Sequence, residues 1–359
     1  MKNIENKITT FLKRGAAADT FSGAQAAWYP RAGVLSAVCA GTTARTGGSH
    51  INRDTLFDIA SVTKTFTAAV VLRMVDRGEM DLESRIDTYF PMLTNRKQGA
   101  ATLAELLAHE AGFTSWLPLF ESIPLSDRAT PRARQRIIES ALEDTGDQSS
   151  VGETVYTDLG FIVLAHLIET VTGQSLDALV AKEVTQPLGL ESVHYRPVRI
   201  EPSSVKKTGV AATENCPWRG HVLIGEVHDD NAWSMGGVAG HAGLFATADD
   251  VARFGQAWLE SLREGGWLSS DLASRAVCRR PGGRGLGWDL VSPAGSSAGN
   301  RFGARSFGHL GFSGCSLWVD PDSDLSVALN TNRVHFGRDN SAIRDFRPAF
   351  HNMLVDLLE

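Results

Sequence analysis

Segments with strand-like sequence lie near both ends of the chain, and the long region between them is mainly helical in pattern. The N-terminal pair, Ala24–Tyr29 and Val34–Ala40, is joined by Pro30–Gly33 and predicts a hairpin. Three further strands are expected at about 305–311, 314–319 and 325–331. We therefore predict an α+β fold with one antiparallel sheet built from both termini, flanked by helices, and an inserted, mainly helical domain.

The expected helices follow from apolar residues at helical spacing and from recognisable end signals. Thr102 and Glu105 have the spacing of a capping box, Gly173 is a C-terminal stop, and Ser175 and Thr247 are expected N-caps. A loop is expected from Pro118 to Gln135. The predicted helices cover residues 3–14, 61–77, 102–107, 136–142, 159–172, 175–184, 247–262 and 343–357, with Pro348 as a kink in the last.

Composition excludes several kinds of partner. The 359 residues carry a formal net charge of −6, which argues against a nucleic-acid surface or a basic membrane patch. No apolar run reaches about 18 residues, and the charged N-terminus lacks the apolar core of a signal peptide, so we expect a cytoplasmic protein without a membrane span. The four cysteines are scattered and are expected to be buried free thiols: Cys39, Cys216, Cys278 and Cys315.

Ser61 and Lys64 form the most informative pair in the chain. They are three positions apart at the start of the predicted helix 61–77, so both side chains are expected on one helix face. A serine hydroxyl becomes a nucleophile when a neighbouring base takes its proton, and a desolvated lysine can be that base. The helix N-terminus also favours negative charge that develops there. A helix cap at Ser61 with a solvated Lys64 is the plainer alternative.

The same spacing occurs twice more, and the context separates these copies from the first. Ser203 with Lys206 and Ser204 with Lys207 lie in a polar run that begins with Pro202. No apolar helical face follows them, so a solvated loop is the better interpretation.

A second and a third element complete a known pattern. Tyr156 and Asp158 stand just before the apolar helix 159–172, and His309, Leu310 and Gly311 lie on a predicted C-terminal strand. With Ser61 and Lys64, this set resembles the penicillin-recognising serine acyltransferases, which include class C beta-lactamases, DD-carboxypeptidases and family VIII carboxylesterases. The segments 106–113, 186–190, 243–247 and 285–288 resemble secondary motifs of that group.

The resemblance implies a beta-lactamase/transpeptidase-like fold and a set of catalytic roles. Ser61 would be acylated, and Lys64 and Tyr156 would share proton transfer. His309 would replace the lysine of the usual Lys-Thr-Gly strand, and the backbone N–H groups of Ser61 and Phe312 would form the oxyanion hole. By the same resemblance, residues 1–75 with 247–359 would form the sheet domain and 76–246 the helical domain, with the active site in the cleft between them.

Three residues depart from the group's pattern. Asp158 would take the place of the usual asparagine that contacts a substrate amide, and Leu310 replaces a threonine that would help bind a substrate carboxylate. Together with His309, these changes favour a carboxylesterase or a peptidase-like hydrolase over a true beta-lactamase or DD-carboxypeptidase. Gly311 and Phe312 complete the implied substrate-binding strand.

A literal Lys207-Thr208-Gly209 triplet competes with His309 for the third element. It lies in mid-chain beside the Ser203 and Ser204 copies, whereas His309 lies on a strand with two more strands after it. We therefore prefer His309.

A polar and glycine-rich pair of segments, 228–232 and 236–243, is expected to form a wall of the cleft. His228 and Asn231 are its candidate substrate-binding residues. Because no third ligand at a recognisable spacing accompanies His228 and Asp229, we predict no metal and no cofactor. The remaining histidines singled out are expected to be structural: His109, His166, His194, His221 and His335.

The sequence thus predicts a serine hydrolase that forms an acyl-enzyme on a small-molecule ester, amide or beta-lactam. Two alternatives remain open: a true beta-lactamase or DD-carboxypeptidase, and a slow-turnover penicillin-binding or sensor protein. The oligomeric state is not predicted.

Overall fold

A six-stranded sheet forms the centre of the fold, with strand order β2-β1-β11-β10-β9-β8. The computed structural model describes residues 2–30, 33–146, 151–198 and 209–359. Neighbouring strands are antiparallel throughout, and β1 pairs with β11 from Ala24–Thr331 to Tyr29–Ser326. The predicted α+β fold, with a sheet from both termini, is confirmed. The strands are β1 (Gly23–Tyr29), β2 (Ser36–Gly41), β8 (Asp289–Leu290), β9 (Phe307–Leu310), β10 (Ser316–Asp320) and β11 (Leu325–Thr331).

Apolar cores cover both faces of this sheet, so β10 and β11 are buried along their whole length. On β10, Trp318 points to one apolar core, and Leu317 and Val319 point to the other. Successive side chains of a strand face opposite sides, which places one core on each face.

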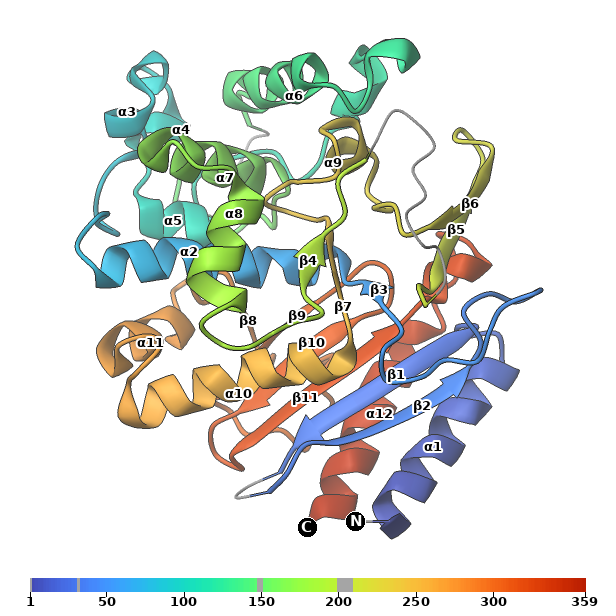
Figure 1. The fold of residues 1–359 in the computed structure, drawn as a ribbon. Coiled ribbons are helices and arrows are strands. Elements are labelled where there is room, and N and C mark those ends of the chain that lie inside the picture. Colours follow the sequence, from blue (N-terminus) through green and yellow to red (C-terminus); the bar gives the residue numbers. More distant parts are fainter. Residues whose placement is uncertain (1, 31–32, 147–150, 199–208) are drawn as a thin grey trace.

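Helices cover each face of the sheet. Helix α1 (Lys2–Ala17) and helix α12 (Ile343–Leu358, with Pro348 inside it) pack on one face, and helix α10 (Ala248–Glu264) packs on the other (Figure 1). Helix α10 approaches the sheet closely at Gly255, where a Cβ would lie 2.2 Å from Ser326 Oγ. Thr247 caps α10 as predicted, by accepting a hydrogen bond from the Asp250 N–H.

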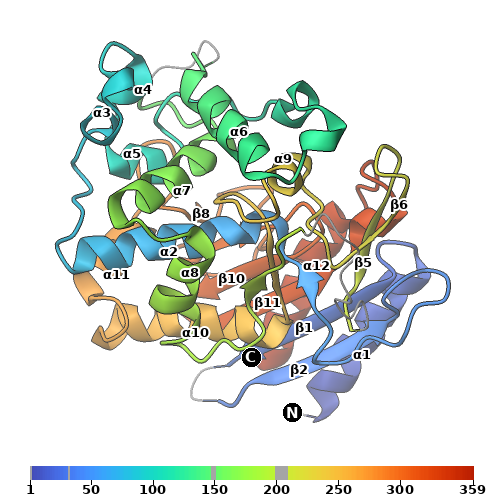
Figure 2. The same cartoon turned by 45° about the horizontal axis from the view of Figure 1, so that its top comes forward.

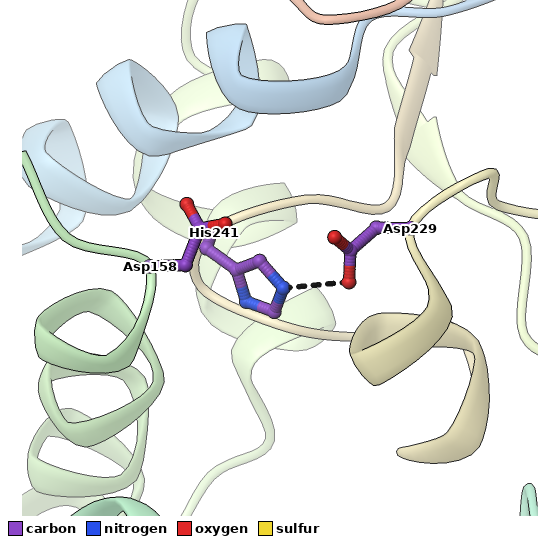
Figure 3. Close-up of side chains that lie close together, drawn as sticks. All are labelled: Asp158, Asp229 and His241. Atoms are coloured by element: carbon purple, nitrogen blue, oxygen red, sulfur yellow. Dashed lines mark hydrogen bonds and ion pairs between the residues drawn. The ribbon is translucent and has the colours of Figure 1, made fainter. Parts of the chain in front are cut away.

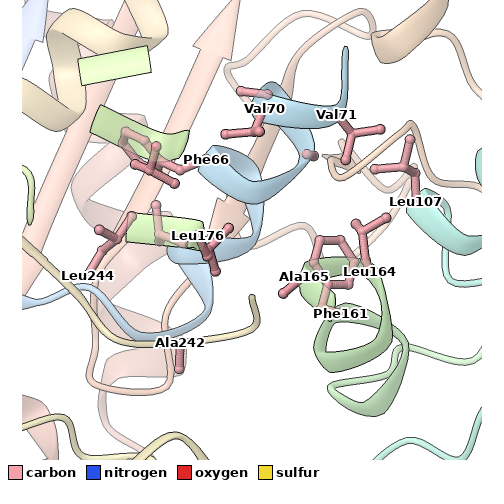
Figure 4. Packing of buried hydrophobic residues seen from close by; sticks show 14 of the residues in the cluster. Phe66, Val70, Val71, Leu107, Phe161, Leu164, Ala165, Leu176, Ala242 and Leu244 are labelled. Atoms are coloured by element: carbon pink, nitrogen blue, oxygen red, sulfur yellow. The ribbon is translucent and has the colours of Figure 1, made fainter. Parts of the chain in front are cut away.

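Helix α2 (Thr63–Asp76) lies between α10 and a group of helices on its other side (Figures 1 and 2). Phe66 stacks on Phe254 of α10, with the ring centroids 4.1 Å apart. On other sides of α2, Phe66, Val70 and Val71 pack among residues of several elements, labelled in Figure 4: Leu107, Phe161, Leu164, Ala165, Leu176, Ala242 and Leu244. Because α2 is buried almost all round, its first turn is held rigidly.

The region after α2 is mainly helical, as expected. The capping box of Thr102 and Glu105 starts α5, and Gly173 adopts the left-handed conformation that ends α7. The helices here are α3 (Ile86–Tyr89), α4 (Lys97–Ala100), α5 (Leu103–Leu107), α6 (Pro131–Glu143), α7 (Leu159–Thr172), α8 (Leu176–Val180, continued by a π-helical turn Ala181–Thr185) and α9 (Asp230–Ser234).

Several short elements were not predicted. A three-stranded sheet orders β3 (Phe57–Asp58), β7 (Leu244–Ala246) and β4 (His194–Tyr195), and β5 (Ala212–Cys216) pairs with β6 (His221–Ile224). Helix α11 (Ser270–Val277) and strand β8 also had no sequence prediction. Strands of two residues are too short to show a periodicity.

Three local predictions need correction. Helix α6 begins at Pro131, inside the expected loop, because Thr130 caps it and a proline suits the first helical position. Ser175 occupies the N-cap position of α8, but its side chain makes no capping hydrogen bond. All four cysteines are free, yet only Cys216 and Cys315 are buried, while Cys278 is exposed.

Among the described residues, no unbroken helix has the length and apolar content that a membrane crossing requires. The helices Leu159–Thr172 and Leu176–Thr185, which are bent sharply relative to each other, have that length and apolar content only when they are counted as one segment. The expected division at residues 75 and 246 stays a prediction.

Candidate active site

Ser61 lies in a 3₁₀ turn, Ala60–Val62, that leads directly into α2. The buried carboxylate of Asp58 fixes this turn: its Oδ1 accepts the Ala60 N–H at 2.8 Å, and its Oδ2 accepts the His228 N–H at 2.7 Å. Ala60 has a φ of +47°, a conformation that costs energy for a residue with a side chain. The turn therefore presents Ser61 in one fixed position at the N-terminal end of α2.

The Lys64 ammonium reaches back to Ser61. Its Nζ lies 3.0 Å from Ser61 Oγ, 2.6 Å from Asp158 Oδ1 and 3.2 Å from the His241 carbonyl oxygen. Lys64 is completely buried, whereas the Asp158 side chain keeps 16% of its surface exposed. The alternative interpretation from the sequence, in which Ser61 is only a helix cap and Lys64 is exposed to solvent, is therefore wrong about Lys64.

Two opposing effects act on the pKa of Lys64. Burial, the largest, lowers it, because a charged amine is poorly solvated inside a protein. The nearby Asp158 carboxylate and the Tyr156 side chain act the other way and prevail, so the pKa of Lys64 is raised above its ordinary value. In this state Lys64 is a cation.

Tyr156 brings its ring to the same group. Lys64 Nζ lies 4.8 Å from the Tyr156 ring centroid, and the Arg284 guanidinium lies 4.9 Å from it. Burial raises the pKa of Tyr156, and the Lys64 charge lowers it only in part, so the phenol is protonated at neutral pH. The buried His109 ring packs 4.7 Å from Tyr156, and its Nδ1 accepts the Thr157 N–H. The expected structural role of His109 thus includes holding Tyr156 in place.

His309 is on β9, with its ring centroid 6.0 Å from that of Tyr156. Its Nδ1 donates to the Leu310 carbonyl oxygen at 2.9 Å, so Nε2 carries the lone pair of the neutral ring. Among the described residues, Nε2 is buried with no hydrogen-bond partner. Burial is the main reason that the pKa of His309 is lowered to about 4, so the ring is neutral at pH 7.

Strand β9 ends against the Ser61 turn. A Cβ on Gly311 would lie 2.5 Å from the Ile59 carbonyl oxygen, so only glycine permits this approach. The next residue, Phe312, is 48% exposed, and the Arg333 guanidinium lies 4.3 Å from its ring centroid. Backbone atoms of residues 311 and 312 are thereby held beside Ser61.

A cavity of about 740 Å³ joins these groups. Nine site residues were predicted from the sequence, and seven of them line this cavity: Ser61, Tyr156, Asp158, His228, His309, Gly311 and Phe312. The eighth, Lys64, lies just behind Ser61. The sequence prediction thus selected residues that the fold brings together from four separate segments.

One wall of the cavity is positively charged. Arg333 and Arg347 are each 7% exposed, and among the described residues their guanidinium groups donate hydrogen bonds to backbone carbonyl oxygens. Burial lowers the pKa of Arg347 to about 10, and the group remains charged at pH 7. Arg344 of α12 adds an exposed guanidinium to the same wall. This wall suits an anionic part of a ligand.

Segment 228–232 was expected to supply two substrate-binding residues, His228 and Asn231, but both side chains have partners within the protein. His228 lines the cavity, but its Nε2 is 3.0 Å from Glu214 Oε2 and its ring stacks on Phe312. Asn231, the ninth predicted residue, is not among the residues that line the cavity. Its amide accepts from the Phe120 N–H and donates to the Leu117 carbonyl oxygen. We infer that Asn231 supports a neighbouring loop.

Asp158, Asp229 and His241 form a second polar group (Figure 3), and two of its members, Asp158 and Asp229, line the cavity. His241 Nε2 lies 2.8 Å from Asp229 Oδ1, and ligand-capable atoms of all three residues lie within 4.8 Å of one another. Such a set could hold a cation by spacing alone. However, the Lys64 ammonium already contacts Asp158, and its charge opposes a second cation there. We assign no metal to the group.

Besides the arginines of the charged wall, three residues that contact the Ser61 turn, Lys64 or Tyr156 had no sequence prediction. Asp58 lies three positions before Ser61, His241 lies within the glycine-rich segment 236–243, and Arg284 lies within the glycine-rich run 282–287. For His241 and Arg284, the sequence signal that could have indicated a site residue was a single polar side chain within a glycine-rich segment. The competing Lys207 and Thr208, and the Ser203 and Ser204 copies, lie outside the described residues.

Comparisons with known proteins identify the family and the fold. The sequence model of the Beta-lactamase family matches residues 6–348. N-acetylmuramyl-L-alanine amidase of Bacillus subtilis is 28% identical over 317 residues, which cover 78% of this chain and 68% of that protein. An Escherichia coli protein with the provisional name D-alanyl-D-alanine carboxypeptidase is 27% identical over 309 residues, covering 78% and 70%. The octameric penicillin-binding protein homologue from Pyrococcus abyssi has the same fold, with a TM-score of 0.71 at 20% identity, over 97% of this chain and 75% of that one.

Proposed function

Because the chain belongs to the Beta-lactamase family, we propose that it is a serine hydrolase that forms an acyl-enzyme on Ser61 and transfers the acyl group to water. The observation that carries this proposal is the buried Lys64 Nζ, 3.0 Å from Ser61 Oγ, at the edge of a cavity large enough for a small molecule. A serine beside an amine is the arrangement that nucleophilic catalysis requires.

The proposed acylation proceeds by addition and elimination. Once Lys64 has lost one of its own protons, Ser61 Oγ bonds to the substrate carbonyl carbon while its proton passes to the neutral Lys64 amine, and the carbonyl π electrons move to oxygen. The N–H groups of Ser61 and Phe312 would stabilise that oxyanion. The bond to the leaving group then breaks, and the leaving group takes the proton by way of Lys64 and Tyr156. Water repeats the sequence on the acyl-enzyme and frees Ser61.

His309 is proposed to assist with its free Nε2. Since its ring is neutral above about pH 4, this atom can accept a hydrogen bond from the Tyr156 phenol or from the substrate. His309 would stand where true beta-lactamases have the lysine of the Lys-Thr-Gly strand. A neutral hydrogen-bond acceptor there, in place of a cation, argues against a true beta-lactamase.

The substrate is proposed to be a small amide or ester with an anionic group. Two relatives are named for amide hydrolysis at amino-acid residues, which supports an amide of an amino acid or short peptide. The wall formed by Arg333, Arg344 and Arg347 supports a carboxylate in the part of the substrate that lies beyond Phe312.

The test compares wild type with Ser61→Ala on p-nitrophenyl butyrate, N-acyl amino-acid amides and benzylpenicillin. We expect wild type to turn over the ester and at least one amide, with a transient acyl adduct on Ser61 by intact mass. Ser61→Ala should lose about three orders of magnitude or more. Ser115→Ala, which changes another serine of the cavity wall, should stay within about threefold.

Two results would redirect the proposal. A stable penicillin adduct without turnover of any ester or amide would support the slow-turnover binding protein. Equal activity in wild type and Ser61→Ala would refute an acyl-enzyme on this residue.

A further inference from the structure

The Lys64 ammonium is saturated as a hydrogen-bond donor. It has three N–H bonds and no lone pair, and three oxygens lie within reach: Asp158 Oδ1, Ser61 Oγ and the His241 carbonyl oxygen. It therefore donates to Ser61 and cannot take the Ser61 proton in this state. A base for Ser61 appears only when Lys64 first loses a proton.

Asp158 is the group best placed to receive that proton. Its Oδ1 is 2.6 Å from Lys64 Nζ, the shortest of the three contacts. An asparagine, the residue expected here by resemblance, could accept the hydrogen bond but could not take the proton. The aspartate thus changes the chemistry of the site while keeping its shape.

We propose that Asp158 is the proton acceptor that converts Lys64 into the base for Ser61 when substrate fills the cavity. This inference rests on the proposed hydrolase function. The proton moves from Lys64 Nζ to Asp158 Oδ1, so an ammonium and a carboxylate become a neutral amine and a neutral acid. The amine then takes the Ser61 proton as Oγ bonds to the carbonyl carbon. After hydrolysis and product release, Asp158 returns its proton to Lys64.

Unequal exposure explains why substrate would trigger the transfer. Lys64 is already fully buried, whereas the Asp158 side chain keeps 16% of its surface open to the cavity. A bound substrate removes that remaining water, and loss of water favours the protonated form of a carboxyl group. A neutral pair also needs less solvation than an ion pair in a dry site.

The surrounding charges favour the same direction. Asp229 approaches Asp158 from the segment before α9, and a nearby carboxylate disfavours a negative charge on its neighbour. His241 lies between them and binds Asp229 at 2.8 Å. The other titratable groups that face the pair are Tyr156, His109, His309 and Arg284, the last paired with Asp289.

The kinetic test uses Asp158→Asn with Asp339→Asn as its matched control. Both variants remove one carboxylate from the cavity wall, but only Asp158 contacts Lys64. We expect Asp158→Asn to lower kcat for p-nitrophenyl butyrate by about 100-fold with KM within about threefold, and Asp339→Asn to retain wild-type kcat within about twofold. The residual activity of Asp158→Asn should rise with pH, because Lys64 must then lose its proton to solvent. Asp158→Glu should recover part of the loss.

Two kinetic outcomes would overturn the inference. Unchanged kcat in Asp158→Asn, with Ser61→Ala inactive, would mean that the hydrolase proposal stands and that Asp158 takes no proton. A loss confined to KM would make Asp158 a substrate contact only.

A second measurement leaves Asp158 in place. In Ser61→Ala labelled with ¹³C at aspartate carboxyl groups, adding p-nitrophenyl butyrate should move the Asp158 signal from the ionised to the protonated chemical shift. A signal that stays at the ionised position, with the ester bound, would refute the transfer even if Asp158→Asn failed to fold.

Discussion

His309 shows how one residue replaces a charged group with a neutral one. A lysine in its place would carry a positive charge, whereas burial keeps this imidazole neutral and leaves Nε2 as an acceptor facing Tyr156. The chemistry available to this wall of the cavity is therefore hydrogen-bond acceptance rather than attraction of an anion. Attraction of an anion is left to Arg333, Arg344 and Arg347.

The pH profile of wild type tests the state of His309. Since the pKa of His309 is lowered to about 4, we expect kcat/KM for a neutral ester to change less than about threefold between pH 7.5 and 5.5 on account of this residue. An ordinary histidine would titrate near pH 6.5 and would give a step there.

The variant His309→Gln should lower kcat/KM about tenfold or more at every pH without adding or removing a step. The exposed His50→Gln serves as the control and should match wild type. A wild-type step near pH 6.5 that disappears in His309→Gln would contradict the neutral ring.

At the scale of single elements, the capping box of α5 is a clear case of local sequence determining structure. Thr102 Oγ1 accepts the Glu105 N–H, and Glu105 returns a bond to the Thr102 N–H. Helix α5 packs against α7 and leads into His109, which supports Tyr156. The cap therefore contributes to the stability of one side of the site.

Thr102→Ala should lower the free energy of unfolding by about 1 kcal/mol. Ser175→Ala is the matched control, because Ser175 occupies an N-cap position without a side-chain capping bond, and it should cost less than half as much. Denaturant unfolding at pH 7.5 measures both. Equal losses would mean that position in the helix, rather than the hydrogen bond, determines the effect.

The first turn of α12 supplies a separate prediction about substrate selection. Arg344 is exposed to the cavity, and within the described parts of the chain its guanidinium forms no ion pair or hydrogen bond with another side chain. Arg344→Ala should raise KM about tenfold for a p-nitrophenyl ester that carries a carboxylate and leave kcat nearly unchanged.

A neutral ester of the same length should show no change in KM with Arg344→Ala. Arg136→Ala removes an exposed arginine from α6, outside the cavity lining, and controls for net charge. Equal KM changes for charged and neutral esters would contradict an anion-binding wall.

For the molecule as a whole, buried histidines set a pH limit on stability. Burial lowers the pKa of His351 to about 3, that of His309 to about 4 and that of His109 well below its ordinary value. Between these values and about 6.5, the unfolded chain binds more protons than the folded chain. The free energy of unfolding should therefore fall as the pH drops from 6.5 towards 4.

Unfolding by denaturant at pH 7.5, 6.5, 5.5 and 4.5 would measure this slope. His351→Gln should make it shallower by removing one of the three groups, and His50→Gln should leave it unchanged. Below about pH 4.5, carboxylates such as Glu214, whose pKa is lowered to about 2, add a further loss. A flat profile down to pH 4.5 would contradict the buried neutral histidines.

The sequence could predict elements and residues that depend on neighbours close in the chain, but not those that depend on contacts between distant segments. The strands β1, β2 and β9 to β11 and helices α2, α7 and α10 have local patterns, and Ser61 and Lys64 are close in any helix. The two-residue strands β3 and β8 exist only because distant segments meet there. His241 and Arg284 reach the site through such contacts, so their roles could not be read locally. The start of α6 was different: Thr130 and Pro131 carried a readable signal that was missed.

The pairing of β1 with β11 joins residues that are about three hundred positions apart in the sequence. The side chain of Asn332 reinforces the join by accepting the N–H groups of Ser22 and Gly23. During synthesis on the ribosome, β1 and β2 emerge long before β11 does, and β1 then has one unpaired edge. The newly made chain must keep that edge from associating with other chains until β11 has been translated. Chaperone supply, rather than the stability of the finished protein, should limit its yield when it is produced quickly.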